Sequence, residues 1–214
     1  MKCTDAINFL LYSYFEVTID DSKEAFINAA IKRAHRDASS HVLSVKEGKK
    51  ENLKQKCSEL IKGEVETLLT SERVYAEFHK DLCKALKEKY NGNTNSPLDF
   101  TYGIAQKWVN MTLKYLCIMN AILKSNSESH EFSKEYSRKL DDIECCLHVP
   151  IDSFILEAAG SKTGDYSLGL EIPHKNKKEL RSYSGSGSLP WSRWDPEDWG
   201  KKENYYLIFQ EKIR

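Results

Sequence analysis

The residues best suited to chemistry lie in two short segments, residues 103–116 and residues 147–156. The first segment is largely apolar but carries four polar residues at helical spacing, Gln106, Lys107, Asn110 and Lys114. In a helix this spacing places all four on one side. The stripe has two amines and two amides but no carboxylate. It therefore predicts a cleft wall that binds an anionic or hydrogen-bonding ligand; the alternative interpretation is a solvated helix face.

Lys107 is the candidate nucleophile of this stripe. It would stand near the start of the helix, where the positive end of the helix dipole disfavours an ammonium. Partial burial beside Trp108 would disfavour the charged form further. Because a neutral amine is a nucleophile and an ammonium is not, this position predicts covalent chemistry at Lys107.

Asp152 is the candidate carboxylate of the second segment. Pro150 holds the preceding chain extended, and an aspartate at this place can cap the helix that follows. The structural interpretation is therefore a helix cap with an apolar entry. The functional interpretation is a rigidly held carboxylate that shares a water-poor recess with Lys107.

The composition argues against several other kinds of site. The chain has 32 basic and 32 acidic residues, so its zero net charge does not imply tight non-specific binding of nucleic acid. None of the six cysteines forms a Cys-x-x-Cys pair, which argues against zinc-knuckle and iron–sulfur sites and favours a reducing compartment. Common phosphate-binding and hydrolase motifs are also missing from the sequence. We therefore expect neither a metal ion nor a cofactor.

The apolar run of residues 7–15 is the only one near the N-terminus that could be mistaken for a targeting segment. It is too short to span a bilayer, and no small-residue cleavage site follows it. We therefore expect a soluble, cytoplasmic protein without a membrane partner.

Apolar periodicity and helix caps predict an all-α protein with a single multi-helix domain. Residues 1–93 would hold the N-terminal helices, residues 94–159 the helices of the site, and residues 160–214 a loop-rich tail with a C-terminal helix. The tail carries three of the four tryptophans, and no convincing strand pattern is present. The expected helices cover approximately residues 5–15, 22–34, 53–61, 71–91, 102–123, 131–146, 152–160 and 205–213.

The two polar segments together resemble the helix-hairpin-helix DNA glycosylases, most closely the archaeal-type 8-oxoguanine DNA glycosylase branch. The resemblance rests on a lysine that opens an apolar helix, here Lys107, and on a Pro-[Ile/Val]-Asp-[Ser/Thr] segment that starts another helix, here residues 150–153. It covers residues 103–156. It implies that Lys107 attacks C1′ of a flipped nucleotide and forms a Schiff base, while Asp152 assists the departure of the base.

An enzyme of this kind would bind DNA and hold the everted base in a pocket, because a base cannot be processed inside the duplex. Aromatic side chains would wall the pocket, and the candidates are Trp108, Trp191 and Trp194. The remaining residues of the stripe, Gln106, Asn110 and Lys114, would contact the substrate.

Two other classes of function stay open. Arg73 and His79 have the spacing of the paired arginine and histidine in ribonucleases of the HEPN type, where the histidine would act as base and the arginine would hold phosphate. The alternative is a surface arginine and a partly buried histidine. The third class is a non-catalytic interaction module in which the tryptophan-bearing residues 190–195 bind a protein partner, or simply clamp the last helix to the core.

Overall fold

The computed structural model describes residues 3–39, 50–91, 100–125, 130–160, 168–175, 180–181, 184, 187–188, 190–194 and 205–213. These residues confirm the predicted all-α class. The helices are α1 Cys3–Phe15, α2 Lys23–Ser39, α3 Lys50–Thr70, α4 Tyr75–Asn91, α5 Tyr102–Lys124, α6 Glu131–Glu144, α7 Ser153–Gly160 and α8 Tyr205–Ile213, with a 3-10 turn η2 at Trp191–Arg193.

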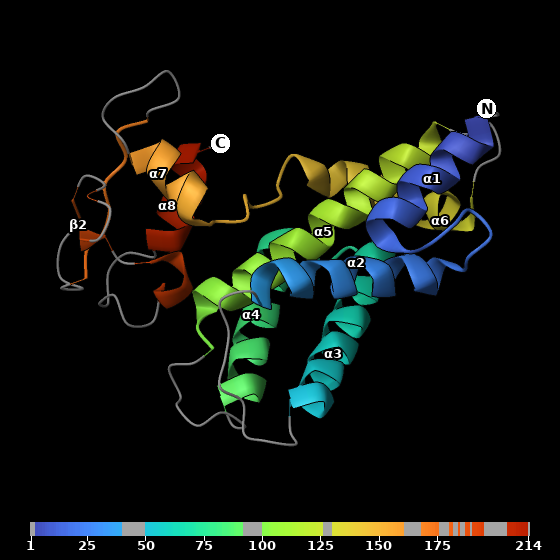
Figure 1. Ribbon diagram of the computed structural model, residues 1–214. Coiled ribbons are helices and arrows are strands. Elements are labelled where there is room, and N and C mark those ends of the chain that lie inside the picture. The colour runs from blue at the N-terminus through green and yellow to red at the C-terminus, as the bar shows by residue number, and fades with distance from the viewer. Residues whose placement is uncertain are drawn as a thin grey trace.

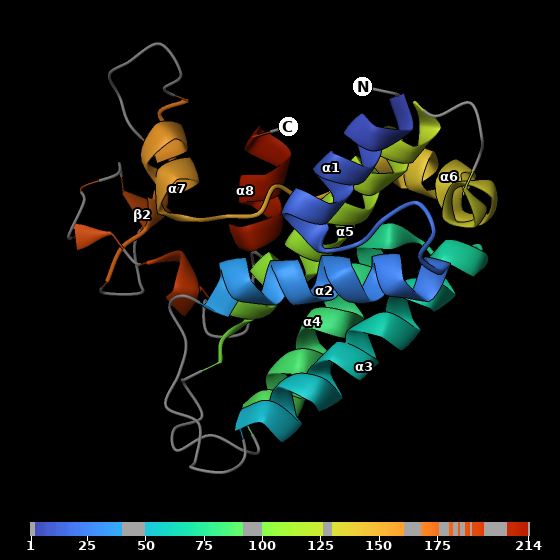
Figure 2. The same ribbon diagram turned by 45° about the vertical axis from the view of Figure 1, so that its right-hand side comes forward.

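Helix α5 is the centre of the fold. In two views α2 lies across it, α3 and α4 run side by side beneath α2, and α1 and α6 lie toward its far end (Figures 1 and 2). The helix begins with Thr101, whose hydroxyl accepts a hydrogen bond from the backbone N–H of Ile104. Every residue from 101 to 113 is buried. The first half of α5 is therefore covered on all sides.

The local rules of helix termination explain most element bounds. Ser22 caps α2 by accepting a hydrogen bond from the backbone N–H of Ala25. α6 is capped by a histidine, because Nδ1 of His130 accepts from the backbone N–H of Phe132.

Four predicted bounds were wrong by two residues or more at the ends that matter here. α4 begins at Tyr75 rather than at Ser71, and α6 ends at Glu144 rather than at Cys146. α2 extends to Ser39 rather than to residue 34, and α3 extends to Thr70 rather than to residue 61.

The C-terminal residues pack against the start of α5. There α7, α8 and two short strands gather in both views (Figures 1 and 2). The strands, β1 Ile172–Pro173 and β2 Leu180–Arg181, form an antiparallel pair that the sequence pattern did not predict. A pair of two residues each is too short to show period-two alternation.

Close packing between η2 and α5 depends on Gly103. Its backbone N–H donates to the carbonyl oxygen of Trp194 at 2.7 Å. A Cβ at this position would stand 2.0 Å from the carbonyl oxygen of Trp191, so any other residue would force η2 away from the helix. The backbone of the tail is thereby fixed within one turn of Lys107.

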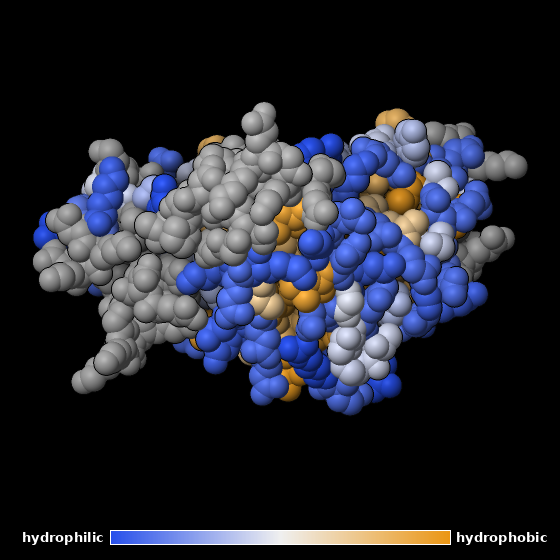
Figure 3. Space-filling model, turned by 90° about the horizontal axis from the view of Figure 1, so that it is seen from below, coloured by the Kyte–Doolittle hydropathy of each residue, from blue (hydrophilic) through white to orange (hydrophobic). Residues whose placement is uncertain are grey.

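Figure 3 shows the face of the molecule that lies at the bottom of Figure 1. Seen from there, it is mostly hydrophilic, and apolar side chains show only between hydrophilic ones (Figure 3). Among the described helices, none is both long enough and apolar enough to cross a membrane.

Candidate active site

Lys107 and Asp152 meet in the structure although 44 residues separate them in the sequence. The Nζ atom of Lys107 lies 3.7 Å from Oδ2 of Asp152. The same Nζ lies 4.7 Å from the centroid of the Trp191 ring. The side chain of Lys107 is 10% exposed and that of Asp152 is 31% exposed. The amine is therefore enclosed, and the carboxylate forms the side of the pair that opens to solvent.

The two carboxylate oxygens of Asp152 face different partners. Its Oδ1 atom accepts a hydrogen bond of 3.0 Å from the backbone N–H of Ile155, which caps the start of α7. Its Oδ2 atom faces Lys107. The hydrogen bond of the cap fixes the orientation of the carboxyl group. As a result, Oδ2 is held toward the amine of Lys107.

A glutamine on α8 fixes the segment that leads to Asp152. The side-chain amide of Gln210 bonds twice to the backbone of Val149, since its oxygen accepts from the N–H and its nitrogen donates to the carbonyl, each at 2.8 Å. Gln210 is itself buried. The C-terminal helix therefore holds the chain three residues before the carboxylate in one place.

The polar stripe on α5 is not a solvated face. Gln106, Lys107 and Asn110 are buried, and only Lys114 is exposed. The amide of Asn110 donates to Oε1 of Gln106 at 2.7 Å and to the hydroxyl of Tyr206 at 3.0 Å. Both amides are thus satisfied inside the protein by each other and by α8, which is the condition under which buried polar groups are stable.

Two histidines join this hydrogen-bonded group. Nδ1 of His148 lies 3.0 Å from the Tyr206 hydroxyl, and Nε2 of His79 lies 3.4 Å from it. The two imidazole rings are in contact, with centroids 4.4 Å apart. Burial, followed by the charge of His148, lowers the pKa of His79 well below its ordinary value of 6.5. Because the group is buried, His79 is held neutral.

A cavity of about 350 Å³ adjoins this group. Its polar lining comes from Asn110, Lys114, Glu144 and His148, and its apolar lining from Cys117, Ile118, Ala121, Leu147, Val149 and Pro150. Lys107 and Asp152 are not among its lining residues. The volume falls at the small end of the range for small-molecule sites. A cavity with a mostly apolar wall and a few polar groups could take a planar ring with hydrogen-bonding edges.

The three predicted pocket walls have different environments. The Trp191 ring contacts the amine of Lys107. Trp108 is 1% exposed, and its Nε1 atom donates to the carbonyl oxygen of Ile31 on α2 at 3.2 Å, so it is a core residue facing away from the site. Trp194 packs edge-on against Phe209 of α8. It fastens the C-terminal helix to the body, as the structural interpretation of residues 190–195 expected.

The ribonuclease pair is not assembled. Arg73 precedes α4, and its guanidinium pairs with Glu64 at 2.5 Å and with Asp81 at 3.0 Å. His79 points instead into the buried group around Tyr206. Arg73 is thus engaged by two carboxylates and His79 is buried, so the ribonuclease role stays a prediction without a geometric observation in its favour.

Sequence reasoning missed the residues that connect the site. Tyr206 and Gln210 come from a segment far from α5 in the sequence, and no motif marks them. His148 lies in the second predicted segment, residues 147–156, but was given no role there. Their signal lies in tertiary contacts alone. Within the described residues, no group of three or more His, Cys, Asp or Glu side chains stands close enough to hold a metal ion.

Comparisons of the chain with family models, with curated proteins and with solved structures found no match.

Proposed function

We propose that the protein is a DNA-glycosylase-like enzyme with lyase character, in which Lys107 is the nucleophile and Asp152 its proton acceptor. The observation that carries the proposal is the distance of 3.7 Å between Nζ of Lys107 and Oδ2 of Asp152, with the amine enclosed beside Trp191. Two groups that cooperate on one nucleotide must lie within reach of each other.

The pair supplies a balanced route for the reaction. Transfer of one proton to Asp152 yields the free amine, which attacks C1′ of the everted nucleotide. The bond between C1′ and the base breaks, the base leaves with the electron pair, and the proton on Asp152 passes to it. Opening of the sugar ring then leaves a protonated imine between Lys107 and C1′.

The lyase character follows from that imine. Its positive nitrogen withdraws electrons from C2′, so a proton can be lost there while the 3′ phosphate departs with the electron pair of its C–O bond. No oxidant or reductant is consumed. The same imine accepts hydride from borohydride, which converts the transient bond into a stable secondary amine.

The neighbouring cavity supports a base-binding role. Asn110 lies three residues after Lys107 on the same helix, so the two Cβ atoms are about 5–6 Å apart. That separation suits a sugar at Lys107 and a base that reaches the cavity of about 350 Å³. Asn110, Lys114 and His148 would contact the edge of the base there, and Trp191 would lie against the sugar.

The test is borohydride trapping on duplex DNA that carries an abasic site or an oxidised guanine. We expect a covalent adduct with the wild-type protein and none with Lys107→Gln. The matched control is Lys124→Gln, because Lys124 lies on the same helix and also pairs with a carboxylate, Asp141 at 2.6 Å, but far along the exposed end. An adduct that persists in Lys107→Gln, or that is lost equally in Lys124→Gln, contradicts the proposal.

Two variants of Asp152 separate its chemistry from its cap. Asp152→Asn keeps an oxygen that can cap α7 but loses the proton acceptor, so trapping should slow by about 100-fold or more. Asp152→Ala loses both and should also lower stability by about 0.5–2 kcal/mol. If Asp152→Asn traps DNA at the wild-type rate, the carboxylate is a cap and nothing more.

A further inference from the structure

Two cysteines stand next to each other where α6 ends. Cys145 and Cys146 are both exposed, and their Sγ atoms lie 3.7 Å apart, which is direct contact. Among the other cysteines whose side chains the structure describes, Cys57 and Cys83 are buried and Cys117 is half-buried. Within these described side chains, Cys145 and Cys146 are therefore the pair of thiols that is both reachable from solvent and already in contact.

Burial also lowers the reactivity of the other described thiols. It raises the pKa of Cys57 to about 11 and that of Cys117 to about 12, and it raises the pKa of Cys83 well above its ordinary value. Because the thiolate is the reactive form, these three thiols react slowly with oxidants near neutral pH. A dissolved oxidant is therefore directed to the exposed pair.

The pair forms the turn that ends α6. The backbone N–H of Cys146 donates to the carbonyl oxygen of Ile143 at 2.8 Å, and the N–H of Leu147 donates to the carbonyl oxygen of Glu144 at 3.3 Å. Both hydrogen bonds satisfy carbonyl groups that a helix leaves open at its C-terminus. The backbone conformation of the two cysteines therefore sets the direction in which the chain leaves the helix.

The same turn lies at one wall of the cavity of about 350 Å³. Glu144 precedes the pair and Leu147 follows it, and both line the cavity together with His148. His148 is held in place, because its backbone N–H donates to the hydroxyl of Tyr75 at 2.9 Å. A change in the turn is therefore taken up mainly at Leu147, and it alters the cavity wall.

We propose that Cys145 and Cys146 are a redox-sensitive dithiol whose oxidation to a disulfide alters the wall of this cavity. The oxidant is a low-molecular-weight disulfide, such as that of glutathione. One thiolate of the pair attacks a sulfur atom of the oxidant and forms a mixed disulfide, and one small thiol leaves. The second thiolate then attacks the protein sulfur of that mixed disulfide, and the second small thiol leaves with the electron pair of the broken S–S bond. In total, two electrons and two protons pass from the protein to the oxidant.

Ring closure must distort the turn. The Cα atoms of neighbouring residues are about 3.8 Å apart, whereas those of disulfide-bonded cysteines are usually about 4.4–6.8 Å apart. A disulfide between neighbours is therefore strained and easily reduced, as reversible disulfides are and structural ones are not. The hydrogen bonds from Cys146 and Leu147 to α6 are the contacts nearest to this strain. The dithiol does not require the proposed glycosylase activity.

Oxidation in a glutathione redox buffer, followed by mass spectrometry, tests the disulfide. Trypsin releases residues 140–162, a peptide that contains Cys145 and Cys146 and no other cysteine. We expect this peptide to lose two hydrogen atoms on oxidation and to regain them on reduction. In Cys146→Ser the mixed disulfide cannot be resolved, so its yield should be about tenfold or more above that in the wild type.

Two further measurements keep the test decisive. Cys117→Ser removes a thiol that lines the same cavity, and it should change the yield of the disulfide by less than about twofold. Phenylarsine oxide, whose arsenic atom bridges two neighbouring thiols, should bind the reduced wild-type protein one to one. It should bind Cys145→Ser and Cys146→Ser about tenfold or more weakly. A glutathione adduct that persists in the wild type, a disulfide between Cys117 and the pair, or a covalent dimer overturns the proposal.

Hydrogen exchange measures the effect on the cavity wall. We expect the amides of Cys146 and Leu147 to exchange about tenfold or more faster in the oxidised protein, because ring closure strains their bonds to α6. If Leu147 is equally protected in the oxidised and the reduced protein, the disulfide does not alter the wall and the proposal is overturned.

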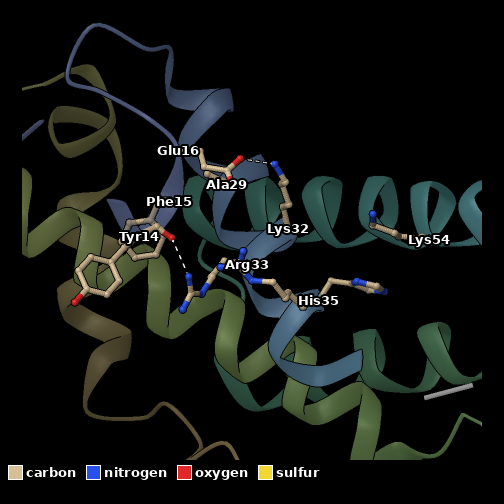
Figure 4. Close-up of a pocket in the computed structure, with 9 residues that line it drawn as sticks. Tyr14, Phe15, Glu16, Ala29, Lys32, Arg33, His35 and Lys54 are labelled. Atoms are coloured by element: carbon tan, nitrogen blue, oxygen red, sulfur yellow. Dashed lines mark hydrogen bonds and ion pairs between the residues drawn. The ribbon is translucent and has the colours of Figure 1, made fainter. Parts of the chain in front are cut away.

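A second cavity, of about 280 Å³, supplies the internal reference for this measurement. It lies between the end of α1, α2 and α3, and none of its described lining residues is a cysteine or belongs to α6. There Arg33 donates to the carbonyl oxygen of Tyr14 at 3.3 Å (Figure 4). The amides of α2 near Arg33 should exchange at the same rate in both forms. Faster exchange there as well would mean that oxidation loosens the whole protein, which contradicts a local effect.

Discussion

The first half of α5 is buried on two sides by different chemistry. On the side of α2, Trp108 fills an apolar interface and donates one hydrogen bond to the backbone. On the side of the tail, Gln106 and Asn110 are buried to the same extent but contact amide, imidazole and phenol groups. Burial alone therefore does not distinguish a core from a site. The distinction lies in whether the buried surface needs polar partners from elsewhere in the chain.

The polar side depends on hydrogen-bond partners from other segments of the chain. Replacing hydrogen-bonded partners by apolar groups of the same shape is often neutral, whereas removing one partner leaves the other unsatisfied at a cost. Tyr206 of α8 bonds to Asn110 of α5, His148 bonds to Tyr206, and Gln210 bonds to the backbone of Val149. Removing one member of this group therefore leaves its buried partners without a hydrogen bond.

The apolar side should give the largest loss of stability. Trp108→Ala empties a fully buried site between α5 and α2, so we expect the free energy of unfolding to fall by about 3–5 kcal/mol. Urea denaturation followed by circular dichroism measures it. If Trp108→Ala lost less unfolding free energy than Tyr206→Phe, the comparison between the two sides would be reversed.

On the polar side, Tyr206→Phe removes the hydroxyl that links Asn110, His148 and His79. Because the partners stay buried, we expect a loss of about 1–3 kcal/mol in the free energy of unfolding. Tyr12→Phe, which changes an exposed tyrosine in the same way, is the control and should be neutral. Equal unfolding midpoints for the two variants would show that the buried hydroxyl contributes nothing.

The two sides were also unequally predictable from the sequence. Periodicity and capping signals located the eight helices of the described residues, because both depend on neighbours along the chain. Thr101, Ser22 and Asp152 follow the usual capping rules. The start of α4 was missed because Ser71, a good cap by type, lies four residues before the helix. The strand pair was missed because it has only two residues on each side.

The site could be predicted only in part. Lys107 and Asp152 were identified by residue type and position, and the structure places them together. Trp108 was assigned to the wrong side of α5, because one residue turns a helix by about 100° and the sequence does not show which neighbour covers each side. The roles of Tyr206 and His148 depend on the docking of α8, which local patterns do not encode.

The pH dependence of stability sharpens the comparison further. Burial and the neighbouring His148 lower the pKa of His79, so the folded protein does not take up a proton that the unfolded chain binds below pH 6.5. Stability is therefore complete above that pH and falls as the pH decreases toward the folded pKa. Between pH 6.5 and 5.5 we expect a loss of about 1 kcal/mol. Urea denaturation should show this slope in the wild type and a smaller one in His79→Phe; identical slopes would exclude His79 as its source.

The smallest effect should come from an exposed ion pair of the same helix. Lys124→Gln breaks the contact with Asp141, but both side chains are about half exposed and water screens the charges. We expect a change of less than about 1 kcal/mol in the free energy of unfolding. A larger loss, measured by the same denaturation, would mean that exposed pairs on α5 matter as much as buried groups do.

Mass spectrometry of the borohydride-trapped complex tests the central claim most directly. After digestion, the peptide that carries the reduced nucleotide fragment should contain Lys107, and the fragment ions should place the added mass on that residue. An adduct mapped to any other lysine, or no adduct on any abasic or oxidised duplex, would contradict the assignment of the Lys107–Asp152 pair as a catalytic centre.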